Sequence, residues 1–160
     1  MKPEEFKPEP QANDEGMELV KYEPWHLMFI LNHPSQALVR KFVKESDAIS
    51  LQRHEYCFSI LKNGSPIASI GLMKYWNGRY EAWAFIIPGH RSDFLYIHNC
   101  VKQFLKHAPC RRIEMTVEQS YPQGHRWAKL LGFKVECERL ESFGPQGGDH
   151  KLYVRIREDL

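Results

Sequence analysis

Apolar and polar side chains alternate in the stretch MELVKY, residues 17–22, as they do in a strand with one buried face. Two stretches with apolar residues at helical spacing follow, WHLMFILNH at 25–33 and SQALVRKFVKES at 35–46, and Pro34 separates them. Ser35 opens the second stretch and is a residue type favoured as a helix N-cap. The pattern predicts one strand and then two short helices, the second capped by Ser35.

Three apolar-rich runs lie between residues 56 and 87. They are joined at Asn63-Gly64 and at Asn77-Gly78, and an Asn-Gly pair between apolar runs is the strongest short-range signal of a hairpin. The runs therefore predict an antiparallel meander of three strands.

From Ser92 the period changes, and apolar residues recur every three or four positions, as on one face of a long helix, until a proline ends the pattern. Strand-like alternation returns at 111–118, and GHRWAKLLG at 124–132 predicts a further helix. Two more alternating runs, 133–141 and 150–158, flank the glycine-rich loop FGPQGGD. The expected order is β-α-α-β-β-β-α-β-α-β-β.

The first sixteen residues, MKPEEFKPEPQANDEG, differ from the rest in composition. They hold three prolines and five carboxylates, with Phe6 as the sizeable apolar group, so burial repays little of the entropy lost on ordering. We expect residues 1–16 to form a flexible arm, either a solubilising extension or a segment that becomes ordered against a neighbouring subunit or a partner. Residues 17–160 have the length of a single domain.

Composition and charge argue against several classes of protein. The chain has 22 Lys and Arg against 20 Asp and Glu, and this balance provides no electrostatic footprint for nucleic acid. No apolar run approaches the roughly 20 residues of a membrane span, and no signal-peptide pattern opens the chain. The four cysteines form no CxxC pair and the eight histidines no two-ligand spacing, so we expect reduced, mostly buried thiols and no metal site. These features predict a cytoplasmic protein.

The stretch HRWAKLLGFKVE, residues 125–136, combines a helix end, a glycine and the start of a strand. Together with the order of elements, AKLLGFKVE resembles the GNAT acetyltransferase superfamily, in which a similar YEKLGF helix end precedes the last two strands. The resemblance covers about residues 17 to 157. It implies an α/β fold with a GNAT-type mixed, mostly antiparallel seven-stranded sheet flanked by about four helices. The residues alone also explain the pattern, since Gly132 can adopt the left-handed conformation that ends a helix, while Phe133 and either Leu130 or Leu131 can pack under the sheet.

In that family the pyrophosphate of acyl-CoA lies on backbone amides between the fourth strand and the long helix, where the positive end of the helix favours anions. The corresponding segment is IIPGHRSDFLY, residues 86–96, so the resemblance implies acetyl-CoA as cofactor. The implied cofactor-binding residues are Ile86, Ile87, Gly89, His90, Arg91 and Ser92. The segment departs from the family pattern, because it has a single glycine and because Asp93 brings a carboxylate to the place of a diphosphate. The alternative is that Ser92 or Asp93 merely caps the helix.

Transfer of an acyl group to an amine needs a base for the amine and an acid for the departing thiolate. Glu81 is placed like the carboxylate base of some family members, and its structural alternative is a cross-strand pair with Arg79 or Lys74. The tyrosine that many members use as the acid corresponds to Ala128 in this chain. Two nearby side chains are candidate substitutes for it, Tyr121 and His125.

Two functions follow from these observations. The first is an acyl-CoA-dependent N-acetyltransferase that transfers acetyl to an amine by direct attack, in a cleft between the fourth and fifth strands. The alternative is a catalytically degenerate GNAT-fold protein with a structural or interaction role, such as a virion-associated component of a tailed phage, present in the host cytoplasm or the virion. The altered loop, the missing tyrosine and the arm favour this alternative, and the arm offers a contact for a protein partner or a homo-oligomer. A sensor that binds acyl-CoA without turnover is a third possibility.

Overall fold

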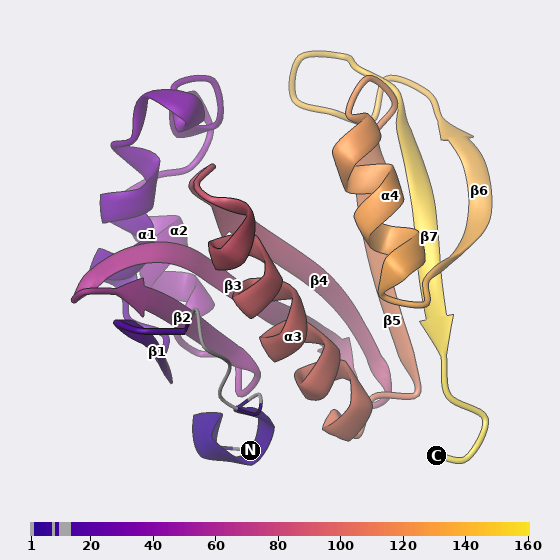
Figure 1. Cartoon of the computed structure of the whole chain (residues 1–160). Helices are drawn as coiled ribbons and strands as arrows, with labels where there is room; N and C mark the ends of the chain where they lie inside the picture. Colours follow the sequence, from indigo (N-terminus) through magenta and orange to yellow (C-terminus); the bar gives the residue numbers. More distant parts are fainter. Residues whose placement is uncertain (1, 8, 10–13) are drawn as a thin grey trace. The chain divides into compact units, whose positions relative to one another are not determined.

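The computed structural model describes residues 2–7, 9 and 14–160 and confirms the predicted fold class. Seven strands follow one another in the sheet in the order β1-β2-β3-β4-β5-β7-β6, with mostly antiparallel pairing. The strands are β1 (Met17–Lys21), β2 (Cys57–Lys62), β3 (Ser65–Trp76), β4 (Arg79–Ile86), β5 (Arg112–Glu118), β6 (Lys134–Leu140) and β7 (His150–Ile156) (Figure 1). The helices are α1 (Pro24–Leu31), α2 (Glu45–Leu51), α3 (Arg91–His107) and α4 (Pro122–Leu130), with 3₁₀ helices at Pro3–Phe6, Pro34–Gln36 and Val39–Lys41.

The chain divides into two compact units. The first unit consists of Met1–Met73 with Trp83–Ala108, and the second consists of Lys74–Ala82 with Pro109–Leu160. Within the described part of both units, no helix has the length and apolar character that crossing a membrane requires.

The hairpins predicted from the two Asn-Gly pairs are confirmed. In the first unit, β1 pairs antiparallel with β2, and β2 pairs antiparallel with β3. Asn63 and Gly64 connect β2 to β3 with φ values of 49° and 82°, the positive values that a two-residue hairpin turn requires. Gly78, in the turn between β3 and β4, has a φ of 90°. Local turn chemistry therefore fixes the meander.

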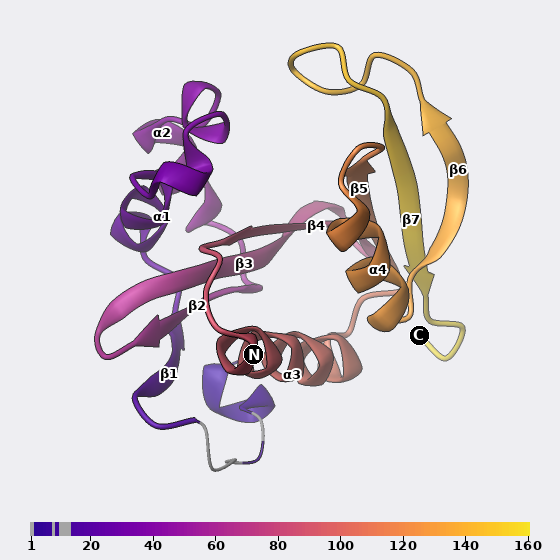
Figure 2. The same cartoon turned by 45° about the horizontal axis from the view of Figure 1, so that its top comes forward.

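Helices cover both faces of the strands in the first unit (Figure 2). On one face, α3 buries an apolar stripe, and the ring of Phe104 lies 5.4 Å from that of Phe58 on β2. On the other face, α1 and α2 close over a cluster formed by Tyr22, Leu27, Leu31 and Ala48. The buried Tyr22 hydroxyl donates to the Ala48 carbonyl at 2.8 Å, which satisfies the polar atom that burial of this tyrosine brings into the core.

The helix predicted at 35–46 is wrong. This stretch forms two separate 3₁₀ turns, and the second α-helix begins later, at Glu45. Ser35 is not a helix cap, because its backbone N–H donates to the His33 ring at 3.2 Å. The later start has a local cause, since Asp47 accepts from the backbone N–H of Lys44 at 2.8 Å and so satisfies a donor at the beginning of α2.

The second unit is a mixed sheet with α4. β4 pairs in parallel with β5 from Arg79↔Arg112 to Glu81↔Glu114, and β5 pairs antiparallel with β7 along its full length. β6 lies at the edge of the sheet, and its register against β7 shifts on both sides of Cys137. The alternation that predicted these strands therefore gives their positions, but it does not reveal the two irregularities in β6.

The stretch that carries the family resemblance forms the expected helix end. Gly132 has a φ of 84°, and the N–H of Phe133 donates to the Ala128 carbonyl at 3.0 Å, which is the 6→1 hydrogen bond of a Schellman motif. Phe133 is buried, Leu131 is half-buried and Leu130 is exposed. The interpretation of Gly132 and Phe133 as a helix stop followed by a core residue is confirmed, whereas Leu130 does not pack under the sheet.

In the described part of the N-terminal segment, Phe6 belongs to the core of the first unit. The ring of Phe6 is only 4% exposed and lies 5.0 Å from Phe58 and 5.2 Å from Phe104. Phe6, which lies in the expected arm, thus packs against the core of its own chain. Residues 1, 8 and 10–13 of the arm lie outside the described residues.

We expect Phe6→Ala to lower the free energy of unfolding by about 2 to 4 kcal/mol, because it removes a ring enclosed by two others. Urea denaturation followed by circular dichroism measures this change. Leu38→Ala is the matched control, since Leu38 is 51% exposed and its truncation should cost less than about 1 kcal/mol. Equal effects of the two substitutions would show that Phe6 does not belong to the core.

His26 is a buried, neutral side chain in the first turn of α1. It is 2% exposed, and its Nδ1 accepts the backbone N–H of Glu23 at 3.0 Å, so Nδ1 carries a lone pair. Burial lowers the pKa of His26, and the Glu23 carboxylate partly opposes this shift. A histidine whose pKa is lower in the folded than in the unfolded state stabilises the fold above pH 6.5, and this contribution is lost as the pH falls below that value.

We expect His26→Gln to reduce the loss of stability on acidification, because a glutamine at this helix position can accept the same N–H without titrating. The free energy of unfolding, measured by urea denaturation between about pH 7.5 and pH 5, should fall less steeply than in the wild type. His107→Gln, which replaces an exposed histidine, serves as the control. A slope unchanged by His26→Gln would refute this role.

Candidate active site

The connection between β4 and α3 in the first unit presents the N-terminus of a long helix. β4 ends at Ile86, and α3 begins at Arg91 with His90 as the preceding residue and without a side-chain cap. The alternative that Ser92 or Asp93 caps the helix is therefore wrong. The first backbone N–H groups of a helix, here those of Arg91 and Ser92, have no acceptor inside the helix and are suited to an anion.

The carboxylate of Asp93 is held by Lys62. Lys62 Nζ donates to the two carboxylate oxygens at 2.9 and 3.0 Å, and the Asp93 side chain is only 13% exposed. The negative charge that the sequence places beside the helix N-terminus is thus compensated from the end of β2. A diphosphate at this N-terminus would meet a neutral ion pair instead of an isolated carboxylate.

The other candidate residues of this segment differ in whether they are exposed and in whether their backbone groups already have hydrogen-bond partners. His90 and Arg91 are exposed, and the atoms that a Cβ on Gly89 would meet belong to the Asp93 carboxylate, the nearest at 3.1 Å. At the end of β4, Gln36 Nε2 donates to the Ile86 carbonyl at 3.1 Å, and the N–H of Ile87 donates to the Ile67 carbonyl at 2.9 Å. The loop is therefore open at 89–91, whereas the backbone at 86–87 already has partners.

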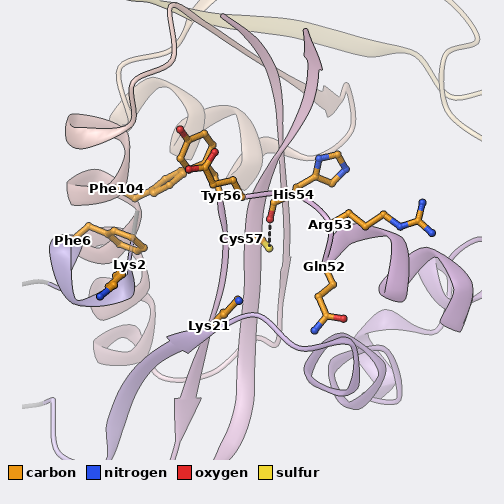
Figure 3. A pocket seen from close by; sticks show the side chains of 10 residues that line it. Lys2, Phe6, Lys21, Gln52, Arg53, His54, Tyr56, Cys57 and Phe104 are labelled. Carbon is orange, nitrogen blue, oxygen red and sulfur yellow. Dashed lines mark hydrogen bonds between the residues drawn. The ribbon is translucent and has the colours of Figure 1, made fainter. Parts of the chain in front are cut away.

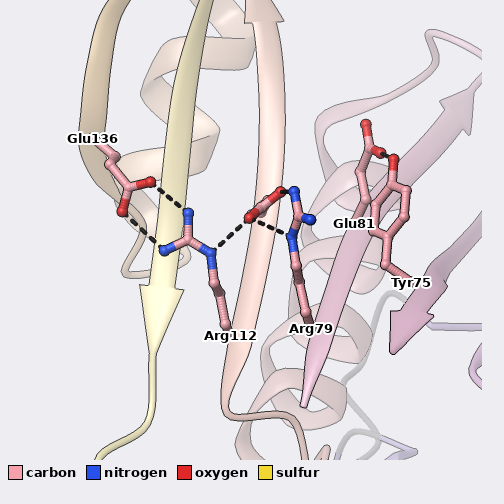
Figure 4. Close-up of polar contacts among 6 residues, drawn as sticks. Tyr75, Arg79, Glu81, Arg112 and Glu136 are labelled. Carbon is pink, nitrogen blue, oxygen red and sulfur yellow. Dashed lines mark hydrogen bonds and ion pairs between the residues drawn. The ribbon is translucent and has the colours of Figure 1, made fainter. Parts of the chain in front are cut away.

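Glu81, the nominated base, lies on β4 in the second unit and accepts a hydrogen bond from the Tyr75 hydroxyl (Figure 4). This bond is the first cause of the raised pKa of Tyr75, ahead of burial. The expected pairing of Glu81 with Arg79 is wrong, because the Arg79 side chain binds another carboxylate. Glu81 is thus oriented by a neutral donor.

The Arg79 guanidinium instead donates to Glu114 on β5, at 2.9 and 3.0 Å. Arg112 also binds Glu114, at 2.6 Å, and extends to Glu136 on β6 (Figure 4). The hydrogen bond from Arg79 is the largest cause of the lowered pKa of Glu114, which is 8% exposed. Such a carboxylate stays ionised with its oxygens occupied, so it is a poor base.

The two acid candidates lie at the start of α4 in the second unit. Tyr121 precedes the first turn and is 55% exposed. His125 has both ring nitrogens engaged, Nε2 with the Glu118 carbonyl at 2.9 Å and Nδ1 with the Tyr153 hydroxyl at 2.8 Å. Because a carbonyl only accepts, Nε2 carries the proton, and Nδ1 accepts from the buried Tyr153. Of the two candidates, Tyr121 has the more accessible proton.

The structure groups the nominated residues into two sets. The six cofactor candidates form one continuous segment of the first unit, and Glu81, Tyr121 and His125 belong to the second. Sequence reasoning missed Lys62 and Tyr75, the partners of Asp93 and Glu81. Lys62 lies 31 residues from Asp93, and no periodic signal connects them. Tyr75 and Glu81 lie on either side of the predicted Asn-Gly turn, six residues apart, so the hairpin did contain a signal for this pair.

The thiols do not add a nucleophile to these sets. All four cysteines are free, and burial raises the pKa of Cys57 to about 11 and that of Cys100 to about 12. Both thiols are protonated near neutral pH. Within residues 2–7, 9 and 14–160, no three His, Cys, Asp or Glu side chains come together as a possible metal site.

Comparison with known proteins identifies the fold. No family model matches the sequence, and no curated protein matches it. A GNAT-family acetyltransferase from Bacillus anthracis is 17% identical, with a TM-score of 0.63 over 89% of this chain and 95% of that chain. YncA, a putative acetyltransferase from Salmonella typhimurium solved with acetyl-CoA, is 11% identical, with a TM-score of 0.65 over 91% and 96%. A putative phosphinothricin N-acetyltransferase is 16% identical, with a TM-score of 0.69 over 88% and 98%. The chain therefore has the fold of the GNAT acetyltransferases, as the resemblance implied.

Proposed function

We propose that the protein is an acyl-CoA-dependent N-acetyltransferase that transfers acetyl to an amine by direct attack. Acetyltransferases share its fold over nearly the whole chain, and one of these was solved with acetyl-CoA. The observation that carries the proposal is the Lys62–Asp93 ion pair, because it removes the main electrostatic objection to a diphosphate at the start of α3. We therefore interpret segment 86–96 as a variant of the family's loop that can still bind an anion.

The residues at the start of α3 suit the cofactor. Arg91 and His90 are exposed beside Gly89, and a guanidinium binds phosphate oxygens through two parallel hydrogen bonds. The N–H of Ser92 adds a donor from the first turn. Ile86 and Ile87 would follow the pantetheine arm, and the Ile86 carbonyl can accept a second hydrogen bond beside the one from Gln36. When bound, the cofactor supplies acetyl as a reactive thioester.

Glu81 takes the role of the general base that receives a proton from the amine. Its bond partner is the neutral Tyr75 hydroxyl, whereas Glu114 is held by two arginines, so Glu81 is the one of these two carboxylates that is suited to accept a proton. Tyr121 takes the role of the acid that protonates the departing thiolate. His125 orients the Tyr153 hydroxyl and supports the first turn of α4.

The alternative, a scaffold without catalysis, makes the opposite prediction for cofactor binding and is decided by the same experiment. Its phage origin and virion association stay predictions, because no comparison bears on them. The acceptor amine, a contact through the N-terminal arm and the cytoplasmic location also stay predictions.

We expect calorimetric titration to show micromolar binding of acetyl-CoA, and Arg91→Ala to raise the dissociation constant about tenfold by removing a phosphate contact. Arg40→Ala, which removes an exposed arginine from the same unit, is the control and should leave the constant unchanged. Lys62→Ala should weaken binding as well, and Asp93→Asn in the Lys62→Ala background should restore most of it, because no carboxylate is then left unpaired. Absence of binding at millimolar acetyl-CoA would establish the scaffold alternative.

We expect Glu81→Gln to lower kcat by about 100-fold or more with any amine that the wild type acetylates, while acetyl-CoA affinity stays unchanged, because the variant lacks a general base. Release of CoA, followed with a thiol reagent, measures the rate across a panel of amines. Glu138→Gln removes a charge from an exposed carboxylate on β6 and is the control. Full activity of Glu81→Gln would assign the base to another group.

A further inference from the structure

A pocket of about 400 Å³ opens in the first unit, away from the start of α3 (Figure 3). Its walls come from four elements: Lys2 and Phe6 from the N-terminal segment, Lys21 from the end of β1, residues 52–57 from the connection between α2 and β2, and Phe104 from α3. The volume is within the range of small-molecule sites.

The charge of this pocket is one-sided. Lys2, Lys21 and Arg53 line it, together with His54, against the single carboxylate of Glu55. Among the described residues, none of the cations Lys2, Lys21 and Arg53 forms an ion pair. The effect of Lys21 reaches the pocket wall, where its positive charge opposes the burial that raises the pKa of Cys57. The excess of positive charge selects an anionic ligand.

The inner wall of the pocket is aromatic. Phe6, Tyr56 and Phe104 are each no more than 9% exposed, and their rings pack in sequence, with Phe104 lying 5.2 Å from Phe6 and 6.3 Å from Tyr56. The Phe6 and Phe104 rings meet edge to face at 65°, and the Tyr56 and Phe104 rings are tilted by 57°. Aromatic rings favour such contacts, so a further aromatic ring can pack against this wall. The pocket therefore joins an aromatic wall to a cationic rim.

Cys57 stabilises the shape of this pocket. Its single S–H donates to the His54 carbonyl at 3.1 Å, and the Leu51 carbonyl is a second possible acceptor at 3.6 Å. The bond to His54 holds the connection after α2 against the start of β2 (Figure 3). Because the thiol is protonated and engaged, it does not react with a ligand. The pocket is thus a binding site without covalent chemistry.

We propose that this pocket binds a small ligand that combines an aromatic group with an anionic group, either a carboxylate or a phosphate monoester. The site is separate from the cofactor residues, since Phe104 and Arg91 lie 13 residues apart on α3, roughly 20 Å along its axis. The proposal does not depend on the acetyltransferase function, and it holds equally for an inactive scaffold.

Ligand-observed NMR and calorimetry with 2-naphthoate, 2-naphthyl phosphate, uncharged 2-naphthamide and inorganic phosphate test the proposal. At least one of the two naphthyl anions should bind, the tighter one identifying the anionic group, and 2-naphthamide and phosphate should bind about tenfold more weakly or not at all. Added salt should weaken binding of the anion. Equal binding of naphthamide and the anions, or no binding of either anion, would overturn the proposal.

Substitutions show whether the naphthyl anion binds in this pocket or at the start of α3. Lys21→Ala should raise the dissociation constant of the bound naphthyl anion about three- to tenfold, because it removes a cation from the rim. Lys102→Ala removes an exposed lysine from α3 outside the pocket and should leave the constant unchanged. Arg91→Ala and saturating acetyl-CoA should also leave it unchanged. Loss of binding with Arg91→Ala and not with Lys21→Ala would place the probe at the start of α3 and refute the pocket.

Discussion

The burial of one face of α3 against β2 is the constraint on which both proposed sites depend. Phe104 packs against Phe58 and Phe6, and this contact fixes the helix on the sheet of the first unit. A helix of 17 residues is rigid over roughly 26 Å. Its first turn can therefore present Arg91 to one ligand while its C-terminal half supplies a wall for another. The aromatic contact that stabilises the core thus also holds in place the helix that carries residues of both proposed sites.

Charge compensation distinguishes the carboxylates of this protein. Largely buried ones are paired with cations, Asp93 with Lys62 and Glu114 with Arg79 and Arg112, because an unpaired charge in such a place is costly. Glu81 differs, since its donor is a hydroxyl. The same principle explains both proposed roles. Pairing with Lys62 compensates the charge of Asp93, so an anion can bind nearby. Glu81 has a hydroxyl instead of a cation as its donor and is therefore suited to receive a proton.

The parts of the fold that depend on local sequence were predictable. The Asn63-Gly64 turn, the Gly132 helix end and the apolar stripe of α3 are each encoded within a few residues, and the structure has all three. The helix predicted at 35–46 failed because its start depends on Asp47, outside the window in which Ser35 stood out. The site was predictable only in part. Segment 86–92 and Glu81 followed from the order of elements, whereas the Lys62–Asp93 pair joins positions that only the folded chain brings together.

The outer edge of the sheet has a bearing on how the protein behaves at high concentration. An uncovered strand exposes backbone donors and acceptors that can template pairing with another chain, the first step of aggregation. β6 occupies that edge, and its register breaks on both sides of Cys137 disturb the regular spacing that an incoming strand would need. Charged side chains, Lys134, Glu136, Glu138 and Arg139, line the same strand. The irregularities that make β6 look poorly formed thus protect the chain against fibril-like self-association.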